Sequence, residues 1–343
     1  MGVPLRDLLH PREVALSDLT GRKLALDAYN MIYQFLATIR QVDGHPFTDR
    51  QGGVTSHLVG LLHRTTSLLR HGVLPAYVFD GPPSELKAAT LHARALAKAR
   101  AQEQWEEALA AGDLEAARKR AGATSRLTPE MAEDARELLR RLGVPCVQAP
   151  SEGEAQAAHM ARQGQVWAAA SEDYDTLLFG APRLVRGLGA IRSGRSEREG
   201  TVQVLEVSEI LQELGIDQRE LIVLGMLVGT DFNEGVYGIG PKKAWKLVQQ
   251  HWGPEATFEK VGVPPSTWRP VLELFENPPV TDRYELVWRR PDPEGVRKFL
   301  VEDRGFDPDR VNRALRGLPS EAPRSASGTQ TTLLAYAEEG TDP

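Results

Sequence analysis

The sequence predicts an α/β fold built on a central, mostly parallel β-sheet. Two short apolar runs, residues 22–27 and 75–80, have the length and composition of buried strands, and each ends in an aspartate. Amphipathic helix patterns around residues 31–40 and 56–72 separate the two runs. A strand, two helices and a further strand form a beginning that is typical of α/β proteins.

Length and composition indicate a soluble globular protein. A chain of 343 residues with 41% hydrophobic content can bury a full core in one to three domains. No run approaches the roughly 18 apolar residues of a membrane span, and the first ten residues are too charged for a signal peptide. The single cysteine, Cys146, cannot form an internal disulfide and is expected in a buried strand. We therefore expect an intracellular protein with no membrane partner. We also expect a monomer.

The net charge of −6 argues at first against a nucleic-acid partner, for which a basic domain is usual. The acidic residues are unevenly spread, however. When seven candidate metal ligands and the residues from 321 onward are left out, the formal charge of the rest is +4. A mildly basic body around an acidic site is compatible with a nucleic-acid substrate.

Residues 151–180 carry two acidic pairs at i, i+2 spacing, Glu152 with Glu154 and Asp173 with Asp175. The second pair follows an apolar run that predicts a strand. An extended chain would point Asp173 and Asp175 to one side and Glu172 to the other. The capping-box pattern Ser-x-x-Glu leaves an alternative open for the first pair, in which Glu154 only reaches back to the backbone of its own helix.

The acids that follow strands predict a metal site. The carboxyl ends of parallel strands share one edge of a sheet, where the functional crevice of such folds lies. Carboxylates gathered there would raise one another's pKa unless divalent cations neutralised them. Oxygen ligands without nearby His or Cys favour Mg²⁺ or Mn²⁺ over zinc. The six acids of this set are Asp27, Asp80, Glu152, Glu154, Asp173 and Asp175.

Residues 84–120 are Ala-rich, highly charged and poor in large apolar side chains, which predicts a helix with little core. Lys87 and Arg94 are seven residues apart and share a helix face. A solvated helix is the ordinary interpretation, but the position just after a candidate ligand favours substrate contact. Tyr33 and Arg40 are also seven apart, and a core tyrosine with a solvated arginine competes there with a role in DNA contact.

The second half of the chain continues the alternation. A helix is predicted from its N-cap at Thr128 to Gly143, followed by a strand over 144–149. A Gly-rich, basic hairpin is predicted over 187–207, and a buried helix after it delivers a seventh acid, Asp231.

The turn before the next helix favours phosphate binding. Gly238 and Gly240 supply a tight turn whose backbone N–H groups can meet a phosphate, with Lys242 and Lys243 adjacent. The turn resembles the helix-hairpin-helix class of DNA-backbone binders. Pro-rich loops near 264–293 and two helices complete the fold, and the composition from residue 320 predicts a disordered tail.

The chain closely resembles the flap endonucleases, in particular the archaeal type, within the XPG family of structure-specific 5′ nucleases. The motifs that carry the resemblance are ALDAYNMIYQFL, YVFDGPP, PSEGEAQAA, SEDYDTLLFG and GTDFNEGVYGIGPKKA, and the similarity extends from residue 1 to about 318. The resemblance implies a PIN-like nuclease fold with a helical arch, a helix-two-turn-helix element and a disordered C-terminal tail.

The resemblance also implies a division of the chain into regions. These are an N-terminal nuclease region at 1–98, an arch or linker at 99–127, an internal nuclease region at 128–258 with the helix-two-turn-helix near 225–251, C-terminal helices at 259–319, and a flexible tail at 320–343.

The resemblance further implies the site. Asp27, Asp80, Glu152 and Glu154 would hold one Mg²⁺, and Asp173, Asp175 and Asp231 a second, with Mn²⁺ able to substitute and K⁺ at the helix-two-turn-helix. Lys87 and Arg94 would steer the scissile phosphate, Tyr33 would stack on a base, and Arg40 would hold the bent junction.

The implied activity is two-metal hydrolysis of branched DNA at 5′ flaps, with 5′–3′ exonuclease activity, in replication, including Okazaki fragment maturation, and in repair. Gln330, Leu333 and Tyr336, within 330–338, resemble the peptide that docks on the sliding clamp, PCNA, although Ala337 replaces its second aromatic residue. Alternatives are a relative that prefers bubbles, nicks or four-way junctions, a catalytically silent DNA- and clamp-binding adaptor, and a Mg²⁺-dependent phosphatase, which would leave the glycine turn unexplained.

Overall fold

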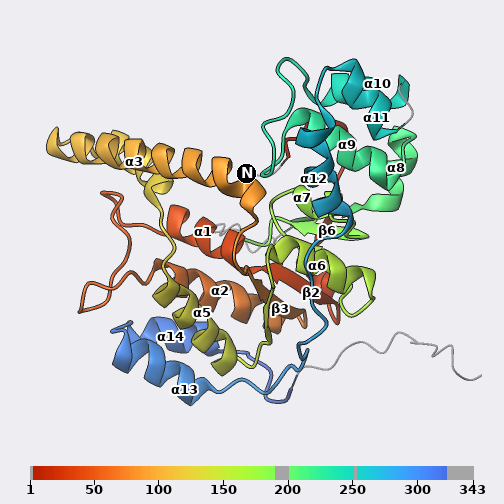
Figure 1. The fold of residues 1–343 in the computed structure, drawn as a ribbon. Coiled ribbons are helices and arrows are strands. Elements are labelled where there is room, and N and C mark those ends of the chain that lie inside the picture. Colours follow the sequence, from red (N-terminus) through yellow and green to blue (C-terminus); the bar gives the residue numbers. More distant parts are fainter. Residues whose placement is uncertain (1–2, 190–200, 251–252, 323–343) are drawn as a thin grey trace, which may run out of the picture.

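The computed structural model describes residues 3–189, 201–250 and 253–322, and in this part of the chain a seven-stranded sheet lies at the centre of the molecule (Figure 1). The strand order is β1-β7-β6-β5-β2-β3-β4. The strands are β1 (Arg12–Ala15), β2 (Lys23–Asp27), β3 (Leu74–Phe79), β4 (Cys146–Gln148), β5 (Ala168–Ala170), β6 (Arg183–Arg186) and β7 (Thr201–Glu206).

The predicted parallel sheet is confirmed for its central part. Strands β6, β5, β2, β3 and β4 run parallel, whereas β7 is antiparallel to both β6 and β1. The hairpin predicted over 187–207 contributes β7, but its partner β6 lies just before the predicted range, and residues 190–200 lie outside the described part of the chain. All five parallel strands therefore end at one edge of the sheet, where the acids follow them.

Both faces of the sheet are covered by helices, because alternate residues of each strand enter opposite cores. Leu24 and Leu26 of β2 pack into one core, and Ala25 between them packs into the other. The first of these cores contains residues of α1 (Ala28–Thr38), α2 (Ser56–Arg70), α5 (Pro129–Arg141), α13 (Pro293–Arg297) and α14 (Pro308–Leu315). The second contains residues of α6 (Gly153–Arg162), α7 (Asp175–Leu178), α8 (Val207–Leu214), α9 (Gln218–Val228), α10 (Pro241–Gln250), α11 (Pro254–Lys260) and α12 (Pro265–Glu276).

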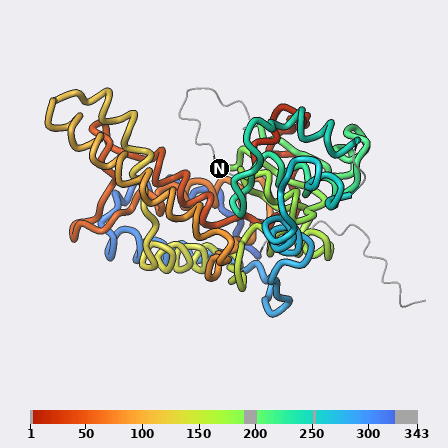
Figure 2. Tube along the Cα trace, turned by 45° about the horizontal axis from the view of Figure 1, so that its top comes forward, coloured from red at the N-terminus to blue at the C-terminus, as the bar shows by residue number. Residues whose placement is uncertain are grey.

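A helical arm projects from the body beside α1 (Figures 1 and 2). It consists of α3 (Ala88–Ala110) and α4 (Leu114–Ala121), which turn back on each other at Gly112, where φ is +72°. The helix predicted over 84–120 is thus two helices, and the arm begins before the predicted boundary at residue 99. Trp105 and Ala117 form a small core of their own inside the arm.

The prediction of Pro-rich loops near 264–293 is wrong for its first half, where α12 forms. Pro265 begins this helix, where its missing N–H has no partner to lose, and Pro270 lies in the helix interior. Trp268, Val271 and Phe275 follow the helical period and enter the core. Burial of this apolar face outweighs the cost of an interior proline.

Three sequence predictions concern chain ends and single residues. Cys146 begins β4 as expected but is half-buried rather than buried. The predicted tail motif, with Gln330, Leu333 and Tyr336, lies outside the described residues. Within residues 3–189, 201–250 and 253–322, none of the helices has the length and apolar character needed to cross a membrane.

Candidate active site

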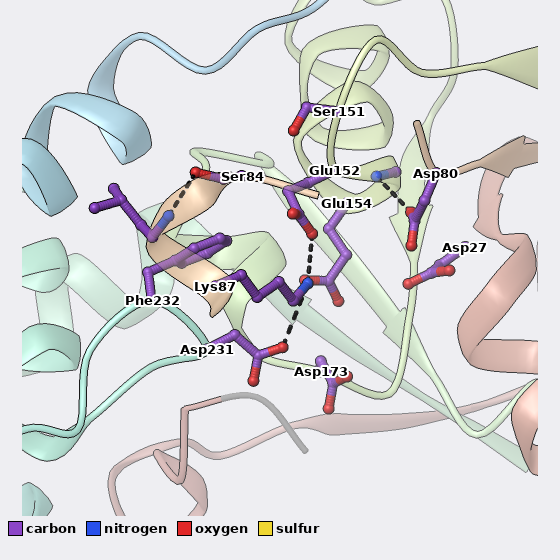
Figure 3. Close-up of polar contacts among 12 residues, drawn as sticks. Asp27, Asp80, Ser84, Lys87, Ser151, Glu152, Glu154, Asp173, Asp231 and Phe232 are labelled. Carbon is purple, nitrogen blue, oxygen red and sulfur yellow. Dashed lines mark hydrogen bonds and ion pairs between the residues drawn. The ribbon is translucent and has the colours of Figure 1, made fainter. Parts of the chain in front are cut away.

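The seven predicted acids gather at the edge of the sheet where the parallel strands end, although they come from five separate stretches of the chain. Figure 3 labels all of them except Asp175. Asp27 ends β2 and Asp80 follows β3, as the sequence predicts. Glu152 and Glu154 flank the beginning of α6, Asp173 and Asp175 follow β5, and Asp231 follows α9.

Backbone N–H groups hold the first two acids in place. Asp27 caps α1, and its Oδ1 accepts a hydrogen bond from the N–H of Asn30 at 2.9 Å. Asp80 Oδ1 accepts from the N–H of Gly153 at 2.7 Å. A Cβ at Gly153 would lie 2.5 Å from that same oxygen, so only glycine allows this approach.

The capping-box interpretation of Glu154 is wrong. Glu152, not Ser151, is the N-cap of α6, and no side chain caps this helix. Glu154 Oε1 instead accepts a hydrogen bond from Ser171 Oγ at 2.7 Å, and Ser151 Oγ donates to the carbonyl of Pro82. Glu154 therefore points towards the end of β5, where the other acidic pair lies.

The second acidic pair is close to the site, but not for the predicted reason. Strand β5 ends at Ala170, and Tyr174 has helical backbone angles of φ −77° and ψ −9°, so Asp175 begins the short helix α7. Asp173 Oδ2 accepts from Asn30 Nδ2, and Asp175 Oδ1 accepts from the N–H of Val3, each at about 2.8–2.9 Å. A tight turn, not an extended chain, brings the pair together.

Crowding of acids shifts their ionisation. Loss of hydration first, and the charge of neighbouring acids second, raise the pKa of Asp27 and of Glu154 well above their usual values. The same two causes raise the pKa of Asp80 to about 6. Loss of hydration raises the pKa of Asp175 to about 7, although the N–H of Val3 opposes the shift. The site therefore favours either protons or added cations.

Two basic side chains from the base of the arm, Lys87 and Arg94, contact this acidic site, and Figure 3 shows Lys87 among the acids. Lys87 Nζ lies 2.5 Å from Glu152 Oε2 and 3.5 Å from Asp231 Oδ2, and 5.5 Å from the centre of the Phe232 ring. Arg94 Nη2 lies 2.5 Å from Asp231 Oδ1. Burial alone would lower the pKa of Lys87, but the attraction of Glu152 and Asp231 raises it overall, so this ammonium stays charged. The predicted shared face of Lys87 and Arg94 is confirmed.

The arrangement is not a closed metal cage. Among the residues that the structure describes, no three His, Cys, Asp or Glu side chains are grouped closely enough to hold a metal ion together. Lys87 bridges Glu152 and Asp231 with its single positive charge. One lysine charge thus lies between these two carboxylates.

The donor set nevertheless fits hard divalent cations. All seven donors are carboxylates, which suit Mg²⁺ or Mn²⁺. Glu152 Oε1 is buried and has no hydrogen-bond partner within the described residues, so a ligand position is left for a cation. Raised carboxyl pKa values are also the expected state of such a site without its ions.

The residues predicted to contact DNA lie in different settings. Tyr33 on α1 is exposed, and Lys98 of the arm lies over its ring at 4.6 Å. Arg40 lies beyond the end of α1, so the predicted shared helix face is wrong. Its half-buried guanidinium donates to the carbonyls of Leu36 and Gly44 and to Ser125 Oγ, which makes it a structural residue and not a solvated one.

The glycine turn before α10 is exposed, as DNA contact requires. Gly238 has φ +75°, a conformation that favours glycine, whereas a Cβ on Gly240 would meet nothing within 4 Å. Lys242 and Lys243 in the first turn of α10 are exposed. Their positive charges and the free end of the helix face solvent together.

Sequence reasoning missed two residues of the site. Asn30 donates to Asp173, and Ser171 donates to Glu154. Both lie in stretches that the sequence analysis singled out, three residues after Asp27 and two before Asp173. A polar side chain beside a metal-ligand candidate is the feature that could have identified them.

Comparisons with known proteins agree with this geometry. Residues 1–101 match the family model of the XPG N-terminal domain, and residues 143–231 match the XPG I-region. Flap endonuclease 1 of Aeropyrum pernix is 48% identical, over 97% of this chain and 99% of its own length. The corresponding values for flap endonuclease 1 of Pyrococcus furiosus are 47%, 98% and 99%.

A solved structure gives the same result in three dimensions. The chain is similar to flap endonuclease-1 from Methanococcus jannaschii with a TM-score of 0.74 and 40% identity, over 92% of this chain and 98% of that one. The fold, the acids at the strand ends, the basic residues at the base of the arm and the near full-length similarity all agree. The chain belongs to the flap endonuclease family.

Proposed function

We propose that this protein is a structure-specific 5′ flap endonuclease with 5′–3′ exonuclease activity. It would hydrolyse phosphodiester bonds at 5′ flap junctions during DNA replication, including Okazaki fragment maturation, and repair. The observation that carries the proposal is the meeting of seven carboxylates at the strand ends with Lys87 and Arg94 from the arm. Membership of the flap endonuclease family supports the substrate.

Two Mg²⁺ ions are the proposed cofactors, with Mn²⁺ able to substitute. The first ion would take Asp27, Asp80, Glu152 and Glu154, and the second Asp173, Asp175 and Asp231, partly through water. When bound, such a pair supplies an activated water and stabilises the leaving oxygen of an in-line displacement. All seven donors belong to one chain, so no partner subunit is needed.

The chain's own basic residues would act on the phosphate. Lys87 and Arg94 now pair with Glu152 and Asp231. Negative charge develops on the phosphate during attack, and positive charges fixed beside it stabilise that state. Exchange of carboxylate for phosphate as the partner of Lys87 would free Glu152 for a cation. No nucleophile from the protein is required.

DNA contact is proposed at two places away from the carboxylates, and Arg40 is proposed to support a third element. Tyr33 is an exposed ring on the arm side of the site and can stack on a base. The turn with Gly238 and Gly240, together with Lys242 and Lys243, can hold a duplex backbone. Three hydrogen bonds already occupy the Arg40 guanidinium, so it would support the turn at 41–46 near the junction. A K⁺ ion at the glycine turn rests on the family resemblance alone.

The test is cleavage of labelled 5′ flap, nick, bubble and blunt duplex side by side, with and without Mg²⁺. We expect the flap to be cut fastest and only with the cation. Preference for bubbles, nicks or four-way junctions would identify a different member of the wider nuclease family. Activity in excess chelator would refute the two-metal proposal.

A variant separates catalysis from binding. Asp173→Ala should abolish cleavage and leave flap binding measurable, because a ligand is lost while the basic surfaces remain. Asp309→Ala, a change of an exposed acid on α14, is the control and should cleave as the wild type does. Binding without cleavage by the wild type itself would instead support the adaptor alternative.

A sliding clamp is the proposed protein partner. Gln330, Leu333 and Tyr336 resemble the clamp-docking peptide, and Ala337 in place of its second aromatic residue predicts weak binding. Clamp titrated against the wild type and against Tyr336→Ala tests the assignment, and equal affinities would cancel it.

A further inference from the structure

Asn30 contacts acids from both proposed ligand sets. Its backbone N–H donates to Asp27 Oδ1 at 2.9 Å, and its side-chain Nδ2 donates to Asp173 Oδ2, also at 2.9 Å. Asp27 belongs to the set proposed for the first ion and Asp173 to the set proposed for the second. They follow the neighbouring strands β2 and β5, which are in register at Leu26 and Ala170. One residue in the first turn of α1 thus holds two strand ends.

From this contact we propose that Asn30 is a positioning residue that fixes Asp173 for cation binding and sets its spacing from Asp27. The inference rests on the proposed two-metal function and adds a residue that contacts neither the ions nor DNA. Hydrogen bonds from such outer residues orient carboxylate ligands, and their loss weakens metal binding about 10–100-fold.

The orientation of the Asn30 amide is fixed from its other side. Gln34 lies one helical turn further along α1, and its Nε2 donates to Asn30 Oδ1 at 3.3 Å. The oxygen of the amide is therefore engaged, and its NH₂ group faces Asp173, which as a carboxylate can only accept. Gln34 is itself confined, because a Cβ on Gly189 would lie 1.7 Å from its Oε1. The hydrogen bonds therefore run in one direction, from Gln34 to Asn30 and from Asn30 to Asp173.

The hydrogen bond leaves Asp173 able to serve as a ligand. Only Oδ2 accepts from Asn30, and a carboxylate has about four acceptor positions. A donor on one oxygen restricts rotation of the carboxylate and so reduces the entropy that cation binding would otherwise cost. It also stabilises negative charge beside Asp27 and Glu154, which repel Asp173.

The two contacts of Asn30 can be separated by mutation. The bond to Asp27 comes from the backbone N–H and survives any substitution except proline. Asn30→Leu keeps a side chain of similar size and removes only the bond to Asp173. The control is Asn277→Leu at the end of α12, since Asn277 Nδ2 also donates to a carboxylate, Glu273 Oε1, at 2.9 Å but on an exposed surface.

The experiment measures Mn²⁺ binding to the full chain from the electron paramagnetic resonance of free Mn²⁺. We expect Asn30→Leu to weaken the more affected ion about 10–100-fold and Asn277→Leu to leave both ions unchanged. The Mg²⁺ concentration for half-maximal flap cleavage should rise by the same factor, while melting temperatures in chelator stay equal for the two variants. A purely structural role would instead lower the melting temperature and leave Mn²⁺ affinity unchanged.

The outcomes distinguish this inference from the proposed function. If the wild type binds no Mn²⁺ or cuts no flap, the proposed function fails. If the wild type does both and Asn30→Leu binds Mn²⁺ equally well, only the role of Asn30 is overturned. Asn30→Ala, which needs less space, carries the same prediction should Asn30→Leu not fold.

Discussion

Proton release should accompany metal binding, because the site holds protons when it lacks cations. The pKa of Asp80 is raised to about 6 and that of Asp175 to about 7. With these values, both groups are ionised together in about 5% of molecules at pH 6 and about 90% at pH 8. Cations bind the ionised form, so Mg²⁺ affinity should rise about 20-fold across this range.

Rising pH should lower the stability of the metal-free fold, although it raises the affinity for Mg²⁺. Both carboxyls have a folded pKa above the unfolded value of 3.8, so the folded state binds more protons than the unfolded state at pH 5–8. The stability that these protonated groups provide is present at low pH and is lost as pH rises through about 6 to 7. Added Mg²⁺ should restore it at pH 8.

Calorimetry in buffers with different ionisation enthalpies counts the protons directly. Mg²⁺ binding should release at least about 1.4 protons at pH 6 and about 0.1 from these two groups at pH 8, since Asp80 and Asp175 are then ionised. The pKa values of Asp27 and Glu154 are raised in the same direction. Affinity and proton release that do not change between pH 6 and 8 would refute the reasoning.

Three further predictions test other parts of the molecule. Lys87→Ala should slow single-turnover cleavage about 100-fold with little change in DNA affinity, and an affinity-only defect would make Lys87 a binding residue. His57 is fully buried, and its burial lowers its pKa to about 4. The free energy of unfolding should therefore fall by up to about 3 kcal/mol as pH falls from about 6.5 to 4. His57→Leu should remove this contribution to the pH dependence, measured by urea unfolding at pH 7 and 4.5. Trp105 of the arm donates a hydrogen bond to the Asp43 carbonyl. Trp105→Ala should therefore speed amide hydrogen exchange in the arm and leave Mn²⁺ binding unchanged. Exchange at the wild-type rate in this variant would show that the contact does not hold the arm.

The strands and the acids that follow them were predictable because buried parallel strands consist of short runs of apolar residues. Asp27 and Asp80 each follow apolar residues that are buried on both faces of the strand, and parallel strands must bring such ends together. The same logic placed Asp231 after a buried helix. These predictions depended on long-range geometry that the fold class alone imposes.

The details that failed depend on local backbone angles and on partners far away in the chain. The spacing of Asp173 and Asp175 gives their direction only if Tyr174 is extended, and its helical conformation is not encoded in that spacing. Arg40 could not be assigned because one of its partners, Ser125, lies 85 residues further along. Glu154 likewise does not cap its own helix, because it accepts a hydrogen bond from Ser171, which follows β5.

The acids proposed as ligands at this edge of the sheet come from separate parts of the polypeptide, and Asp231 is the last of them to be synthesised. A nascent chain that has already formed β2 and β3 therefore holds Asp27 and Asp80 without the acids that complete the set. The complete set of acids would therefore exist only after Asp231 has been synthesised, more than two thirds of the way along the chain.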